Sequence, residues 1–154
     1  LAVLEGYATG LAARNLTKPD LAHLTGINRS MTEAMGRLDS LSFGRLNQEF
    51  HSYIVERCGN AALVGLIRDV GSRLDAIRRT IFLQIPYRGA ASVAEHSALI
   101  QLISQRAPLS DIEENAREHK FHTVASFRNW QNENQGVLAP ASASASASAS
   151  ARGR

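Results

Sequence analysis

The stretch NAALVGLIRDVGSRLDAIRRTIFLQI, residues 60–85, decides the fold of this 154-residue chain. Its apolar residues recur every three or four positions, at Leu63, Ile67, Val70, Leu74, Ile77 and Ile81. That spacing places them on one face of a long α-helix, because an α-helix turns once in about 3.6 residues. Asn60 can cap its start and Pro86 ends it. A helix with one long apolar face needs other helices to cover that face.

The chain on both sides shows the same helical spacing, interrupted by capping and helix-breaking residues. We expect helices at residues 2–15, from the cap at residues 17–20 to residue 25, from residue 28 through Leu38, and at residues 42–58, 90–105 and 108–132. Gly26 is expected to end the second helix and Asn28 to cap the third. No segment alternates between apolar and polar residues over a useful length, so no strand is expected. The sequence predicts an all-α fold, an antiparallel bundle of six or seven helices.

The composition indicates one domain without a nucleic-acid or membrane surface of its own. The 17 basic and 14 acidic residues are largely interleaved, with a net charge of only +3 and no basic block. No apolar run is long enough to span a membrane, and the start has no signal-peptide pattern. Because Cys58 is the only cysteine, the chain can form no internal disulfide, which favours a cytoplasmic location. Since the first residue is Leu1, we expect a fragment or a processed chain.

The last part of the chain differs from the rest. From about residue 139 it repeats alanine and serine and then ends in Arg-Gly-Arg. This composition offers no apolar face to bury. We therefore expect a helical domain at residues 1–132 and, at 133–154, a low-complexity tail that is disordered or was added to the natural chain.

Three histidines lie on apolar faces of three different expected helices. The faces comprise Asn47, His51, Ile54 and Cys58; Val93, His96, Ile100 and Ile103; and Ile112, Ala116, His119 and Thr123. Inward faces converge in a small bundle, so the three imidazoles can meet and bind a divalent metal, with the Asn47 oxygen as a fourth, neutral ligand. The alternative is that each histidine is a core residue hydrogen-bonded to a neighbour. His122 is a rival for His119, and His23 is expected at the surface.

Several short segments resemble one known domain. They are Leu46-Asn-Gln-Glu-Phe50-His51, Gly59-Asn60-Ala-Ala-Leu63, Arg88, Glu95-His96 and Ala116-Arg-Glu-His119. In order and spacing they resemble the FCD domain, the C-terminal effector-binding domain of the FadR subfamily of GntR-type bacterial transcription regulators. The similarity covers about residues 1–130.

The resemblance implies a divalent metal, commonly zinc or nickel, held by one Asp or Asn and three histidines. By position these are Asn47, His51, His96 and His119. The family more often has Asp where this chain has Asn47, so we expect weaker metal binding and a relative preference for carboxylate ligands.

The resemblance also implies that the domain senses a small organic acid bound against the metal. An arginine fork pairs well with a carboxylate. Arg88 is the first candidate for this contact, and Arg78 and Arg73 are weaker ones. The alternative for each is a solvated surface charge, which is favoured for Arg73.

The family implies a homodimer that contacts DNA only through an N-terminal winged helix-turn-helix, which this chain lacks. Acid binding would shift helices and change the spacing of the two DNA-binding domains. Two other functions remain open: a metal-dependent hydrolase, and a metal-free dimerisation bundle. Against the hydrolase, Glu49 and Glu95 adjoin the predicted ligands in sequence and therefore point away from them on a helix. We therefore expect no enzymatic activity.

Overall fold

The computed structural model describes residues 1–134, with side chains for residues 1–73, 85 and 88–134. Six helices make up this part of the chain: α1 (Ala2–Ala13), α2 (Lys18–Gly36), α3 (Ser40–Val55), α4 (Ala61–Gln84), α5 (Pro86–Ser104) and α6 (Leu109–Asn134). The described residues contain no strand. The predicted all-α class is therefore confirmed, with six helices. The expected tail at 133–154 lies almost wholly outside the described residues.

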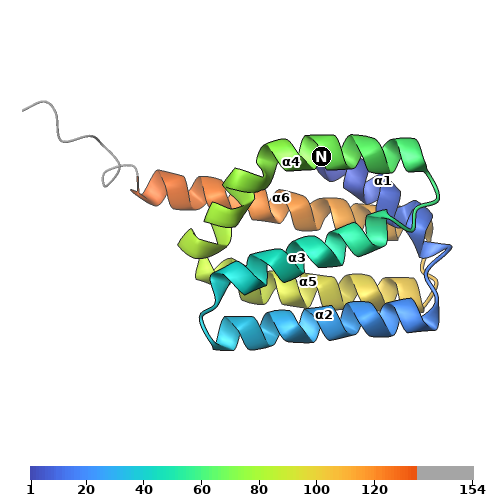
Figure 1. The fold of residues 1–154 in the computed structure, drawn as a ribbon, viewed down its shortest axis with the longest axis horizontal. Coiled ribbons are helices and arrows are strands. Elements are labelled where there is room, and N and C mark those ends of the chain that lie inside the picture. Colours follow the sequence, from blue (N-terminus) through green and yellow to red (C-terminus); the bar gives the residue numbers. More distant parts are fainter. Residues whose placement is uncertain (135–154) are drawn as a thin grey trace, which may run out of the picture.

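Successive helices run back and forth along one axis (Figure 1). α2 packs against both α3 and α5, and α6 packs against both α5 and α1. α4 starts beside α3 and then bends across one end of the bundle toward the start of α5 (Figure 1). None of the described helices combines the length and the apolar character needed to cross a membrane.

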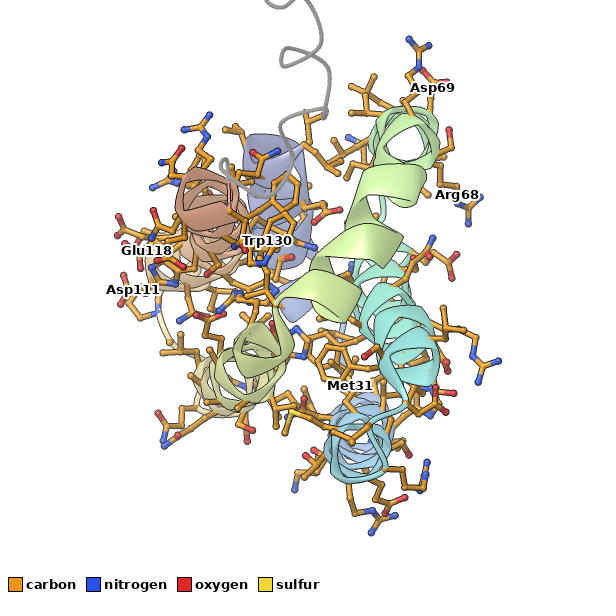
Figure 2. The ribbon with its side chains drawn as sticks, turned by 90° about the vertical axis from the view of Figure 1, so that its left-hand side faces the viewer. Met31, Arg68, Asp69, Asp111, Glu118 and Trp130 are labelled. Carbon is orange, nitrogen blue, oxygen red and sulfur yellow. The ribbon has the colours of Figure 1, made fainter. Side chains whose placement is uncertain are left out.

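The core lies along the inner faces of these helices. Its fully buried larger side chains are Leu24, Met31, Phe50, Ile54 and Ile112. In the view along the bundle, Met31 lies between helices, whereas Arg68, Asp69, Asp111 and Glu118 project outward (Figure 2). Among the residues whose side chains are described, the apolar faces predicted from the sequence thus pack into a single core.

The predicted helix break at Gly26 is wrong, because α2 runs from Lys18 through Gly26 to Gly36. A glycine inside a helix costs about 1 kcal/mol relative to alanine. Burial of Leu24, Ile27 and Met31 on one face outweighs that cost. The predicted cap at the start of this helix is confirmed, since Thr17 and Asp20 form a reciprocal capping box.

Two further boundaries differ from the prediction and affect the site. Asn28 is not a helix cap: it is buried within α2, and its side-chain amide donates to the Val93 carbonyl and the Ser97 hydroxyl on α5, both at 3.0 Å. α5 begins at Pro86 rather than near Ala90, because proline suits the first turn of a helix. Arg88 therefore lies in the first turn of α5, two turns before Glu95.

Small residues let α1 approach α6 closely. A Cβ at Gly6 would lie 3.0 Å from the Glu113 carbonyl oxygen and 3.3 Å from the Arg117 Cβ. Ala8 and Ala12 on the same helix are fully buried. This tight contact brings Glu5 of α1 against the middle of α6.

Candidate metal centre

Three imidazoles from three helices meet in the interior of the bundle. His51 comes from α3, His96 from α5 and His119 from α6. The His51 Nε2 atom lies 3.1 Å from the His119 Nε2 and 3.3 Å from the His96 Nε2. One nitrogen from each ring lies within 4.8 Å of the other two. His96 and His119 are buried and His51 is half-buried.

The structure distinguishes His119 from its rival. The His122 side chain is 59% exposed, and its Nδ1 contacts Glu95 at 2.9 Å rather than the other imidazoles. His23 is exposed and packs against the Tyr53 ring, as expected for a surface histidine. Of His119, His122 and His23, only His119 therefore joins His51 and His96.

Two polar side chains fix the orientation of the buried rings. His96 Nδ1 lies 3.2 Å from the Asn28 side-chain oxygen, whose amide nitrogen already donates to α5. His119 Nδ1 lies 2.6 Å from a Glu95 carboxylate oxygen. Both partners accept hydrogen bonds, so each ring carries its hydrogen on Nδ1. In the neutral ring this leaves an Nε2 lone pair turned toward His51.

Hydrogen bonds among the three imidazoles cannot satisfy all three Nε2 atoms. A neutral His51 has one hydrogen and can donate it from Nε2 to only one of the two facing lone pairs. A divalent cation would engage all three nitrogens. Tetrahedral zinc with bonds of about 2.0–2.1 Å separates its nitrogen ligands by roughly 3.3 Å. The His51 Nε2 lies at similar distances, 3.1 and 3.3 Å, from the Nε2 atoms of His119 and His96. The donor set therefore fits a divalent metal.

Burial keeps the two inner rings in the form that binds metals. Burial lowers the pKa of His96 well below its ordinary value, and the nearby His119 and Lys120 lower it further. Burial also lowers the pKa of His119, partly offset by the hydrogen bond to Glu95. Both rings are therefore neutral near neutral pH, with lone pairs available for coordination.

Asn47 lies one turn before His51 on α3. Its side-chain oxygen is buried and has no hydrogen-bond partner among the described residues. A buried amide oxygen without a partner is costly, and binding a cation would remove that cost. Asn47 also lines the same cavity as His51. This unsatisfied oxygen is an independent sign that a cation fits here.

The cavity beside the imidazoles has a volume of about 210 Å³. Its walls come from α1, α3, α4 and α6, and its lining includes Glu5, Asn47, His51, Arg68 and Lys120. Pockets for drug-sized ligands usually hold about 300–1,000 Å³. This cavity suits a smaller molecule.

Arg88, the first candidate for binding an effector, is engaged inside the protein. Its guanidinium is 2% exposed and forms a two-bond fork with the Glu95 carboxylate, at 3.0 and 2.5 Å. It also donates to the Thr123 hydroxyl and the His119 carbonyl. Arg88 does not line the cavity. Its geometry is that of a residue that holds Glu95, and through Glu95 His119.

The two weaker arginine candidates lie on α4. The Arg78 side chain is outside the described residues. Arg73 is exposed and pairs with Asp69 at 3.1 Å on the outer face of the helix. This position agrees with the solvated surface charge favoured for Arg73.

Sequence reasoning missed Glu95 and Asn28 as partners of the rings. The Glu95 carboxylate has its pKa well below the ordinary value: burial opposes ionisation, but hydrogen bonds from His119, Arg88 and His122 outweigh it. Arg88 and Glu95 are seven residues apart, a spacing that puts them on one helix face and could have signalled the pair. Asn28 gave no such signal, because its partners on α5 are about 65 residues away.

These features define an all-helical bundle with a histidine-lined centre beside a small cavity. A comparison with models of protein-sequence families matches the FCD domain over residues 1–120. The chain belongs to the FCD domain family, which comprises effector-binding regulatory domains of GntR-type regulators. A comparison with curated protein sequences found no match.

Proposed function

We propose that this chain is the sensing domain of a FadR-subfamily regulator, and that it binds a small organic acid against a divalent metal, zinc or nickel. Asn47, His51, His96 and His119 are the proposed metal ligands. The observation that carries this proposal is the meeting of three Nε2 atoms, two of them with lone pairs fixed by Asn28 and Glu95.

The charge of this ligand set favours an acid as effector. Three neutral imidazoles and one neutral amide leave the full charge of a divalent ion uncompensated, and a bound metal attracts a carboxylate oxygen into a free coordination position. The cavity of about 210 Å³ next to Asn47 and His51 provides space for a compact acid.

The surroundings favour sensing over hydrolysis. Glu95 contacts the far side of His119, at Nδ1, and is held there by Arg88. Glu49 is exposed on α3. The cavity-lining acids Glu5 and Glu56 are paired with Lys120 and Arg68, each at 2.6 Å. A general base would have to leave one of these pairs before it could activate water.

Regulation then follows from coupled binding. We also propose that the chain forms a homodimer, as its family resemblance implies. The acid then shifts the arrangement of helices only as far as it prefers one arrangement over another. A winged helix in the whole regulator would read this shift as a change in DNA affinity.

The metal is tested first. Protein purified without a nickel column is loaded with zinc or nickel, dialysed and analysed for metal, and zinc affinity is measured by calorimetry. We expect one ion per chain for the wild type and for His23→Ala, the exposed control, and a strong loss for His51→Ala. Equal metal content in the wild type and His51→Ala overturns the proposed site.

The acid is tested next by thermal unfolding of the zinc-loaded protein with a panel of small carboxylates. A ligand at 100 times its dissociation constant stabilises the folded state by about 2.7 kcal/mol. No stabilisation by any acid, together with turnover of an ester or lactone, would instead support the hydrolase.

A further inference from the structure

A buried ion pair forms the wall of the cavity contributed by α1 and α6. The Lys120 ammonium lies 2.6 Å from the Glu5 carboxylate. The side chains are 14% and 7% exposed, respectively, and both residues line the cavity together with Asn47 and His51. A lysine and a glutamate held out of water in a ligand-sized cavity are costly unless they are well paired.

Lys120 is the cation best placed to meet an acid in this cavity. Among the described residues that line it, the other cation is Arg68, whose side chain is 66% exposed and pairs with Glu56. Arg88 lies outside the lining and is held by Glu95. Of the protein's own cations, Lys120 therefore attracts an anion inside the cavity most strongly, because its surroundings screen charge least.

We propose that Lys120 forms a second anion subsite and that the effector is a compact dicarboxylate. This inference rests on the proposed function: one carboxylate lies at the metal centre and the other replaces Glu5 at Lys120. Both subsites border one small cavity, so a short molecule with an acid group at each end reaches both. A monocarboxylate reaches only the metal centre and leaves the Lys120–Glu5 pair intact.

The exchange keeps Lys120 compensated, because one carboxylate takes the place of another. Glu5 is released toward solvent, and α1 loses an ion pair to α6. A dicarboxylate thus breaks a link between these two helices that a monocarboxylate leaves in place. The differential contact required for a ligand to shift the position of α1 is therefore present.

Succinate and butyrate are the probes, because they share a four-carbon chain and differ in the second carboxylate. Their affinities for the zinc-loaded 154-residue chain are measured by calorimetry, after zinc stoichiometry has been confirmed for every variant. A charge-assisted hydrogen bond contributes about 1.5–3 kcal/mol. We therefore expect Lys120→Met to weaken succinate roughly tenfold to a hundredfold and to leave butyrate nearly unchanged, and Lys120→Arg to retain most of the affinity.

Glu5→Gln provides the decisive comparison, because it breaks the same ion pair from the other side. It removes the competitor for Lys120, so succinate should bind more tightly and gain more than butyrate does. A purely structural pair predicts instead that Lys120→Met and Glu5→Gln change succinate binding in the same direction.

Each outcome has a distinct meaning. Equal binding of succinate and butyrate by the wild type, or equal losses of both in Lys120→Met, overturns the second subsite and leaves the proposed function standing. Failure of the wild type to bind zinc, or any acid once loaded with zinc, overturns the proposed function and this inference with it. If Lys120→Met does not fold, Glu5→Gln and Lys120→Arg still decide the matter.

Discussion

Glu95→Gln is expected to weaken both the fold and the metal centre, because Glu95 joins Arg88 to His119. The carboxylate accepts two hydrogen bonds from the Arg88 fork and one each from His119 and His122. Glutamine keeps one acceptor oxygen but carries no charge. The variant leaves the Arg88 guanidinium, 2% exposed, without a counter-ion.

The expected loss of stability in Glu95→Gln follows from how deeply the Arg88–Glu95 ion pair is buried. Breaking a buried ion pair by removing one partner costs about 3–5 kcal/mol, whereas an exposed pair contributes about 0–1 kcal/mol. The Glu95 side chain is 23% exposed, so the effect should lie below the upper end. We expect the free energy of unfolding of the metal-free protein to fall by about 2–4 kcal/mol. Loss of a residue that orients a metal-binding histidine should also lower zinc affinity by roughly tenfold to a hundredfold.

The assay is a double-mutant cycle by denaturant unfolding of wild type, Glu95→Gln, Arg88→Met and the double variant. Each single variant leaves a charged or polar partner unsatisfied. The double variant should therefore be destabilised by at least about 1 kcal/mol less than the sum of the two single-variant losses. Glu49→Gln is the matched control, since Glu49 is exposed on α3. The reasoning is refuted if Glu95→Gln is as stable as Glu49→Gln, or if the cycle shows no coupling.

Four further substitutions test the metal centre, the packing of α1 on α6 and the pH dependence of stability. Asn47→Asp adds a carboxylate to the proposed ligand set and should raise zinc affinity about tenfold or more in calorimetry; an unchanged affinity would place residue 47 outside the set. Gly6→Ala should lower the free energy of unfolding by about 1 kcal/mol, because the new Cβ meets the Glu113 carbonyl. Gly26→Ala should raise the free energy of unfolding by up to about 1 kcal/mol, because the space around Gly26 is open and alanine favours a helix. Similar effects of the two substitutions would contradict the close approach of α1 to α6. Asp20→Asn tests the pH dependence of stability. Hydrogen bonds from Thr17, and also from Tyr53 and Arg57, hold the pKa of Asp20 in the folded protein well below its ordinary 3.8. The stability that Asp20 contributes is therefore fully present above pH 3.8 and is lost as pH falls through the lower, folded-state pKa. The difference between wild type and variant in urea unfolding should therefore narrow with falling pH, and a constant difference would contradict this assignment.

Local signals in the sequence predicted most of the helices correctly. The long helix predicted at residues 60–85, the helix cap predicted at residues 17–20 and the helix end predicted at Pro86 depend on neighbours in the chain, and each is present in the structure. The prediction failed at Gly26, where a local cost is overcome by burial that the sequence does not show directly.

In the candidate site, too, local spacing predicted one part and tertiary packing decided the rest. Helical spacing predicted that His51, His96 and His119 face inward, because a helix fixes which side chains share a face. It could not choose between His119 and His122, since the two are three residues apart and so lie on neighbouring turns of the same side of a helix. Only the packing of α6 on α5 places His119 in the interior and His122 at the surface.

By itself, the sequence determined the all-helical class, the resemblance to the FCD domain and the imidazoles on inward faces, because these depend on residue type and spacing. The tertiary structure alone decided which groups meet. It joined Glu95 of α5 to His119 of α6, set Asn28 behind His96, and closed Lys120 onto Glu5 across a long separation in the chain. Each of these contacts joins two different helices, and a pattern within one helix does not encode the position of its neighbours.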